Sequence, residues 1–161
     1  MQDRATALAA EIGTLLKQRG WTLATAESCT GGLVSHAITN ISGSSTYFMG
    51  GVVAYDNKVK RRLLEVPEEW LRQYGAVSRQ VALAMARGVR RLLGTDVGIS
   101  VTGIAGPTGG TPEKPVGTVF IAVVSPLGEE VEHHLWEEDR LGNKRLSAEA
   151  VLTLLKRHLE G

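Results

Sequence analysis

Cysteine is almost absent from this sequence, because Cys29 is the only one among 161 residues. A single thiol forms no internal disulfide and supplies no paired-cysteine metal site, which indicates a reducing compartment and a protein without a structural metal. A chain of this length buries enough surface to fold without such cross-links. We therefore expect one domain over residues 1–161, in the cytoplasm, with no bound metal.

An excess of charge of either sign is also missing. Lysine and arginine number 18 against 17 aspartate and glutamate residues, so no net field attracts nucleic acid or an anionic membrane surface. No apolar run approaches the roughly 20 residues of a membrane span. The first residues, Met1–Gln18, mix charged and apolar side chains, unlike the apolar core of a signal peptide. These absences argue against nucleic acid and membranes as partners.

Strand-like and helical patterns alternate along the chain. Strands are predicted at about 21–26, 49–55, 97–101, 116–125 and 129–136, and helices at 3–19, 31–40, 57–64, 67–72, from Ser78 to Gly94, and at the C-terminal end. This alternation favours an α/β fold with parallel strand pairing. The run Met49–Tyr55 is expected to be a strand buried on both faces.

Parallel pairing has a positional consequence. The segments that follow the first three strands, Glu27–Gly32, Tyr55–Lys60 and Thr102–Pro115, would emerge at the same carboxyl edge of the sheet, where open α/β sheets bind ligands. A tight turn at Pro126–Gly128 makes strands four and five antiparallel, and a reversal in the long loop would bring Glu137–Arg145 to that edge too. We expect a site where these four segments meet.

The stretch TAESCTGG places Ser28 in a strand-to-helix turn. The backbone N–H groups of Thr30, Gly31 and Gly32, at the start of the next helix, could hold an oxyanion or a phosphate. Ser28 is a candidate nucleophile, although a serine before a helix is commonly a cap. Thr30 is the better candidate for the cap. Cys29 is an alternative nucleophile, but a buried, inert thiol is the simpler interpretation.

A serine hydroxyl needs a base, and the histidines are poorly suited to that role. They fall inside a helix, on the last strand or near the C-terminus. Lysine serves as the base in some serine enzymes once burial or nearby cations lower its pKa. The segment YDNKVK supplies Lys58 and Lys60, with Tyr55 at the end of the preceding strand.

The loop TGIAGPTGGTPEKP is too long and too rich in glycine to be a simple connection. Its residues Thr102, Gly103 and Gly106 would let the backbone approach a ligand closely. The loop lacks the Gly-Lys-Ser/Thr ending of a nucleotide P-loop, which argues against nucleoside triphosphate hydrolysis. A surface lid without a ligand is the alternative interpretation.

Several motifs together resemble one known family. AESCTGG, SGSSTYFMGGVVAYDNKVK, GAVS, VTGIAGPTGG and KPVGTV occur in the order and spacing of the CinA C-terminal domain family. The resemblance implies a three-layer α/β/α sandwich with a mixed, mostly parallel sheet of about five strands. It also implies a homo-oligomer that needs no cofactor. Stand-alone members include amidases that hydrolyse the carboxamide of nicotinamide mononucleotide to nicotinate mononucleotide and ammonia, in pyridine nucleotide salvage.

By position, the resemblance assigns the nucleophile to Ser28, the catalytic lysine to Lys60 and the motif tyrosine to Tyr55. The family's late Asp-Arg pair matches Asp139 and Arg140, and Arg140 becomes a candidate substrate ligand. A second arginine of the family meets Lys144 here, with Arg145 one residue later, so either could contact the ligand. An alternative function is a nucleotide-binding or regulatory module with the same pocket and little turnover.

Overall fold

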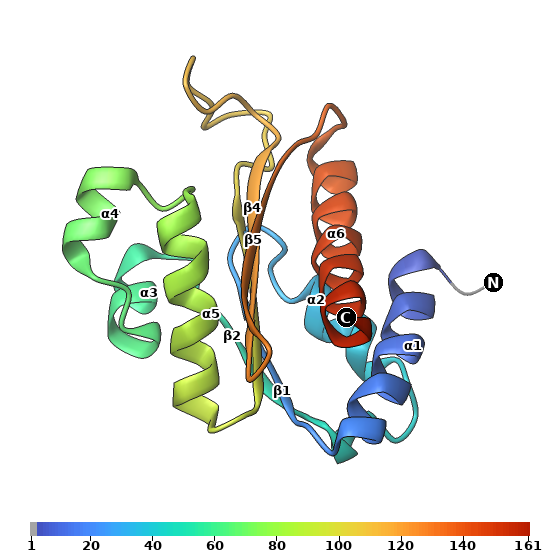
Figure 1. Cartoon of the computed structure of the whole chain (residues 1–161). Helices are drawn as coiled ribbons and strands as arrows, with labels where there is room; N and C mark the ends of the chain where they lie inside the picture. The colour runs from blue at the N-terminus through green and yellow to red at the C-terminus, as the bar shows by residue number, and fades with distance from the viewer. Residues whose placement is uncertain (1–2) are drawn as a thin grey trace.

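The computed structural model describes residues 3–161 (Figure 1). Its helices are α1 (Arg4–Arg19), α2 (Leu33–Thr39), α3 (Asn57–Leu64), α4 (Glu68–Tyr74), α5 (Arg79–Leu93) and α6 (Arg140–Glu160), with a short 3-10 turn η1 (Ser44–Thr46). Its strands are β1 (Leu23–Glu27), β2 (Phe48–Val53), β3 (Val97–Gly103), β4 (Thr118–Ser125) and β5 (Gly128–Leu135). Each of the predicted elements is present, with boundaries that differ by a few residues.

The five strands form one mixed sheet in the order β2-β1-β3-β4-β5. Strand β1 pairs in parallel with both β2 and β3, whereas β4 is antiparallel to β3 and β5 is antiparallel to β4. Strand β5 therefore runs in the same direction as the three parallel strands. The predicted reversal between strands three and four is confirmed, and with it the mixed, mostly parallel sheet.

Helices cover both faces of this sheet, which confirms the three-layer α/β/α architecture. Helices α1, α2 and α6 lie on one face, and α3, α4 and α5 lie on the other (Figure 1). The larger core cluster joins β3 and β4 to α1 and α6 through residues such as Ile12, Ile99, Ile121 and Leu155. A second cluster lies under α5 and includes Leu64 and Met85. A third, small cluster packs Ala82 and Ala86 of α5 against Ala122 and Val124 of β4. The sheet is thus covered by apolar contacts on both faces.

Helix α5 approaches the end of α3 very closely at one glycine. A Cβ atom built on Gly88 would lie 2.0 Å from the carbonyl oxygen of Leu64. Only a residue without a side chain fits this contact, because backbone atoms at that distance cannot move aside as a flexible side chain can. The contact holds the end of α3, the helix that carries Lys60, directly against α5.

The expectation that the second strand is buried on both faces is wrong. Strand β2 lies at an edge of the sheet, and exposed and half-buried residues alternate along it. The side chains of Met49 and Val53 are 48% and 50% exposed. An edge strand has a neighbour on one side only, so its apolar composition does not guarantee that both faces are covered.

Within residues 3–161, no helix combines the length and the apolar character needed to cross a membrane.

Candidate active site

The candidate site lies where β1, β2 and β3 end at one edge of the sheet. Strand β1 ends at Glu27, and the N–H of the next residue, Ser28, donates to the Val101 carbonyl of β3 at 3.0 Å. On the other side, the N–H of Ala54 donates to the Glu27 carbonyl at 2.7 Å. The backbone before Ser28 is therefore held between two parallel neighbours. This confirms the expectation that segments distant in sequence meet at this edge.

A cavity of about 210 Å³ opens beside Ser28. It is lined by Ser28, Cys29, Tyr55, Asn57, Lys60, Ala76, Val77, Thr102, Gly103, Ala105 and Arg140. Six of the residues singled out from the sequence are in that set: Ser28, Tyr55, Lys60, Thr102, Gly103 and Arg140. A neighbouring depression is lined by the three turn residues Thr30, Gly31 and Gly32, together with Leu141, Lys144 and Arg145.

Lys60 and Ser28 are in direct contact in this cavity. The Nζ atom of Lys60 donates to Ser28 Oγ at 3.1 Å, to the Ala54 carbonyl at 2.8 Å and to the Tyr55 carbonyl at 3.1 Å. The whole residue is 1% exposed. Helix α3 begins at Asn57 and is capped by Asp56, whose carboxylate accepts from the N–H of Lys58 at 2.7 Å. This start sets the rotation of the helix that points Lys60 inward.

Burial lowers the pKa of Lys60 from 10.5 to about 8, against a smaller opposing effect of the Asp56 carboxylate. The cause is the loss of hydration, which disfavours the charged ammonium. In the neutral amine, two N–H bonds can point to the two carbonyl groups while the lone pair faces Ser28 Oγ. This arrangement can remove the hydroxyl proton and return it to a leaving group.

The two alternative candidates, Lys58 and Cys29, have environments that do not suit a base or a nucleophile. Lys58 is exposed on the outer side of α3, as expected for a solvated lysine. Cys29 is only 7% exposed, and burial raises the pKa of its thiol to about 12. A thiol with so high a pKa provides almost no thiolate near neutral pH, so Cys29 fits the inert role rather than that of a nucleophile.

The turn after Ser28 is organised differently from the sequence-based expectation. The N–H of Gly31 donates to the Ser28 carbonyl at 3.1 Å, and the N–H of Gly32 donates to the Glu27 carboxylate at 3.2 Å. These two groups are therefore already engaged within the turn. The N–H groups of Cys29 and Thr30 are the remaining candidates to hold an oxyanion.

The expectation that Thr30 caps α2 is also wrong. The N-cap position is Gly32, which has no capping side chain. The Thr30 hydroxyl instead donates to Glu27 Oε1 at 2.7 Å, and the same carboxylate accepts from the first N–H groups of the helix. Glu27 was missed as a functional candidate. Its signal in the sequence is an acidic residue at the end of a buried strand, directly before the candidate nucleophile.

Tyr55 contacts Lys60 through its backbone and Arg140 through its side chain. Its carbonyl accepts from Lys60 Nζ, whereas its hydroxyl accepts from Arg140 Nη2 at 3.3 Å. Arg140 Nη1 donates to the Gly106 carbonyl at 2.7 Å. Gly106 thus contributes a carbonyl that orients the guanidinium rather than a surface of the cavity. Thr102 is anchored by a bond from its hydroxyl to the Ala76 carbonyl at 2.8 Å.

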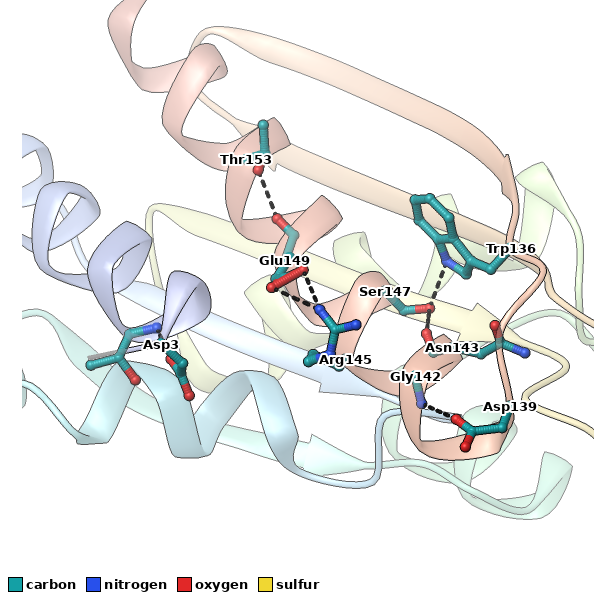
Figure 2. Close-up of polar contacts among 10 residues, drawn as sticks. Asp3, Trp136, Asp139, Gly142, Asn143, Arg145, Ser147, Glu149 and Thr153 are labelled. Carbon is teal, nitrogen blue, oxygen red and sulfur yellow. Dashed lines mark hydrogen bonds and ion pairs between the residues drawn. The ribbon is translucent and has the colours of Figure 1, made fainter. Parts of the chain in front are cut away.

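Arg140, the first residue of α6, lines the cavity. Several side-chain bonds fix this end of the helix (Figure 2). Asp139 caps the helix by accepting from the N–H of Gly142 at 2.8 Å, and the Trp136 indole donates to Ser147 Oγ at 3.0 Å. Asn143, which the sequence did not single out, is buried and donates to the Ala105 carbonyl at 3.0 Å. The Asn143 bond joins α6 to the glycine-rich loop.

The two late cations, Lys144 and Arg145, have different surroundings. Arg145 pairs with Glu149 one helical turn later, at 3.3 Å (Figure 2). Lys144 extends toward the turn after Ser28, since a Cβ atom built on Gly31 would lie 3.7 Å from its Nζ atom. Lys144 is therefore the cation that lies beside the turn after Ser28. No group of three or more histidine, cysteine or acidic side chains within residues 3–161 could hold a metal ion.

The fold and the site define a class: an α/β/α domain with a buried serine–lysine pair at the carboxyl ends of its parallel strands. The family model described as CinA C-terminal domain matches residues 5–159, and the chain belongs to this family. The resemblance seen in its motifs is thereby confirmed.

Relatives and solved structures agree with this membership. A CinA-like protein of Salinibacter ruber is 51% identical over 152 residues, which cover 94% of this chain and 37% of that protein. The chain thus spans well under half of such curated relatives. The competence/damage inducible protein CihA of Agrobacterium tumefaciens is 40% identical with a TM-score of 0.92, covering 100% of this chain and 98% of the other. A CinA superfamily protein of Klebsiella pneumoniae is 31% identical with a TM-score of 0.93, covering 99% of both chains.

The lowered pKa of Lys60 predicts a pH dependence of stability. The folded protein binds the Lys60 proton less tightly than the unfolded chain does, because the pKa falls from 10.5 to about 8. Between these two pH values the unfolded state binds more protons, so this group makes the free energy of unfolding rise with pH. At pH 7 both states are protonated, and the folded state carries the full cost of burying the cation.

We expect the unfolding free energy of the parent protein minus that of Lys60→Met to increase by on the order of 2 kcal/mol between pH 7 and 10.5. Urea unfolding at a series of pH values measures this difference, and Lys58→Met, at an exposed position of the same helix, is the matched control. A flat difference for Lys60→Met would show that burial does not perturb this lysine.

Proposed function

We propose that this protein is an amidohydrolase that converts nicotinamide mononucleotide to nicotinate mononucleotide and ammonia by a serine–lysine mechanism. The observation that carries the proposal is the 3.1 Å contact between Lys60 Nζ and Ser28 Oγ in a buried position. The proposal also uses the family's known activity. We place the reaction in cytoplasmic pyridine nucleotide salvage and expect the enzyme to be a homo-oligomer.

In the proposed mechanism, neutral Lys60 takes the proton of Ser28 as Oγ attacks the carboxamide carbon of the substrate. The carbonyl oxygen becomes an oxyanion, and the N–H groups of Cys29 and Thr30 stabilise it. Lys60 then donates the proton to the departing nitrogen, and ammonia leaves. Water, deprotonated by the same amine, hydrolyses the resulting acyl-serine and restores the free hydroxyl.

The substrate has an amide at one end and a phosphate at the other, so the site must also attract an anion. Net charge is only +1, and attraction therefore has to be local. The helix start after Ser28 is a poor phosphate site because the Glu27 carboxylate already occupies its N–H groups. Arg140, at the rim of the cavity and beside the Gly106 carbonyl, is the better candidate to bind the phosphate.

Ammonia release from nicotinamide mononucleotide by the purified protein tests the function directly. Ser28→Ala should fold normally and lose nearly all of this activity, because the nucleophile is gone. Cys29→Ala should keep most of it. Full activity in Ser28→Ala would end the covalent mechanism. Binding of the nucleotide by the parent protein without ammonia release would instead favour the regulatory module.

Lys60 and Lys58 allow a matched comparison on one helix. An arginine is not deprotonated near neutral pH, so Lys60→Arg should be nearly inactive, whereas Lys58→Arg should be close to normal. In the parent protein, kcat/KM should rise with pH up to about 8, the pKa to which burial lowers Lys60. Equal activities of the two variants would remove Lys60 from the role of base.

Arg140 is tested by comparing two substrates. A charge-assisted bond to a phosphate contributes roughly 1.5–3 kcal/mol. Arg140→Ala should therefore lower kcat/KM for nicotinamide mononucleotide about 10- to 100-fold, with a much smaller effect on nicotinamide riboside, which has no phosphate. An equal loss for both substrates would assign Arg140 to the support of Tyr55 and of the glycine-rich loop, and the phosphate to another position.

A further inference from the structure

The side chain of Glu27 is the most heavily hydrogen-bonded group near the site. The residue is 1% exposed. Its Oε1 atom accepts from the Thr30 hydroxyl at 2.7 Å, from the Gly32 N–H at 3.2 Å and from the Val34 N–H at 2.9 Å. Its Oε2 atom accepts from the N–H and the hydroxyl of Ser35, at 3.0 and 2.7 Å. The carboxylate accepts five hydrogen bonds and donates none.

A buried carboxylate is costly unless such bonds compensate for its lost hydration. Here the compensation comes from the exposed N–H groups at the start of α2, where the helix dipole favours a negative charge. Helix α2 has no cap of its own, because Gly32 has no side chain. The carboxylate of the preceding strand thus replaces the missing cap and ties β1 to α2.

All five donors follow Ser28 in the sequence, whereas Glu27 precedes it. The backbone of Glu27 is fixed in the sheet by pairing with Val53 and Val101. Ser28 and Cys29 therefore form a short bridge with both ends clamped. Lys60 is held separately, by the carbonyl groups of Ala54 and Tyr55. The relative position of the two reacting groups then depends on the Glu27 clamp.

We propose that Glu27 is a positioning residue: its carboxylate fixes Ser28 Oγ within reach of Lys60, and aims the N–H groups of Cys29 and Thr30 at the reacting carbonyl. This inference rests on the assignment of Ser28 as the nucleophile in the proposed function. Glu27 itself does not line the cavity beside Ser28. It acts through the geometry of the turn and not by touching substrate.

The test measures the environment of position 28 without using the amidase reaction. In a Ser28→Cys, Cys29→Ala background, residue 28 carries the only thiol of the chain, since Cys29 is the sole cysteine. Its alkylation by iodoacetamide at pH 7, followed by mass spectrometry, reports the thiolate fraction, which the neighbouring Lys60 cation increases. Glu27→Gln keeps nearly the same side-chain shape. It replaces one accepting oxygen by an NH2 group, which would face N–H and hydroxyl donors instead of accepting from them.

We expect Glu27→Gln to slow alkylation at least about 10-fold, because the thiol moves away from Lys60. In the protein with Ser28 intact, Glu27→Gln should lower kcat for ammonia release at least about 100-fold, while KM changes less than about 3-fold. Ser35→Ala removes one of the five bonds and keeps the charge of Glu27, and it should slow alkylation about 2- to 5-fold.

Ser125→Ala is the structural control. It removes a buried hydroxyl that lies 2.6 Å from His158 Nε2, at the end of β4, and thus at the sheet edge opposite the site. It should lower thermal stability and leave the alkylation rate within about 2-fold. If Ser125→Ala slowed alkylation as much as Glu27→Gln does, the effect would be general destabilisation and the inference would be overturned.

Folded Glu27→Gln that is alkylated at the parent rate would overturn the inference. If Glu27→Gln does not fold, Ser35→Ala decides in the same way, and an unchanged rate counts against the proposal. Slowed alkylation in a protein that releases no ammonia from nicotinamide mononucleotide would support the positioning role while rejecting the proposed function. Ammonia release by the parent enzyme, together with unchanged alkylation in the variants, would support the proposed function while rejecting the positioning role.

Discussion

The buried amine of Lys60 is the group on which the arrangement of this site depends. Three oxygen atoms surround its Nζ atom: the hydroxyl of Ser28 and the carbonyl groups of Ala54 and Tyr55. Burial disfavours its charge and lowers its pKa to about 8, so the amine can exchange a proton near neutral pH. Burying the ammonium lowers the stability of the fold. The packing of α3 against α5, including the close contact at Gly88, compensates for this loss.

Two residues of opposite charge type are thus buried beside Ser28: Glu27 precedes it in the chain, and Lys60 reaches it from α3. They are stabilised in different ways. Lys60 is solvated by carbonyl oxygens at the end of β2, whereas Glu27 is solvated by N–H groups at the start of α2. Neither one pairs with the other. Each side chain is bonded to the backbone groups nearest to it. The two groups therefore order opposite sides of the site without forming an ion pair. Pre-organisation of this kind lets a site stabilise charge that develops during a reaction without a large rearrangement.

Much of this could be predicted from the sequence. Alternating strand and helix patterns indicated the α/β class, and the order of polar segments placed Ser28, Tyr55, Lys60 and Arg140 at one edge, because parallel strands end on the same side. Three details failed for one reason, which is that they depend on neighbours in space. The apolar run at 49–55 became an edge strand with an exposed face. The cap of α2 came from Glu27 and not from Thr30. The N–H groups of Gly31 and Gly32, expected to hold an anion, were already bonded within the turn.

The sequence by itself determined the family, the order of the elements and the residue types at the site, because periodicity, turn residues and motif spacing are local properties of the chain. The motif position pointed to Lys60, but only the tertiary structure decided that its environment differs from that of Lys58. Lys58 and Lys60 are two residues apart on the same helix, yet Lys58 is exposed and Lys60 is buried, with 1% of its surface exposed. Burial is a property of the packed assembly, since it depends on which strands and helices exclude water from a given atom. The same exclusion determined that the carboxylate of Glu27, an ordinary acidic residue in the sequence, is buried and bonded to the residues that follow Ser28.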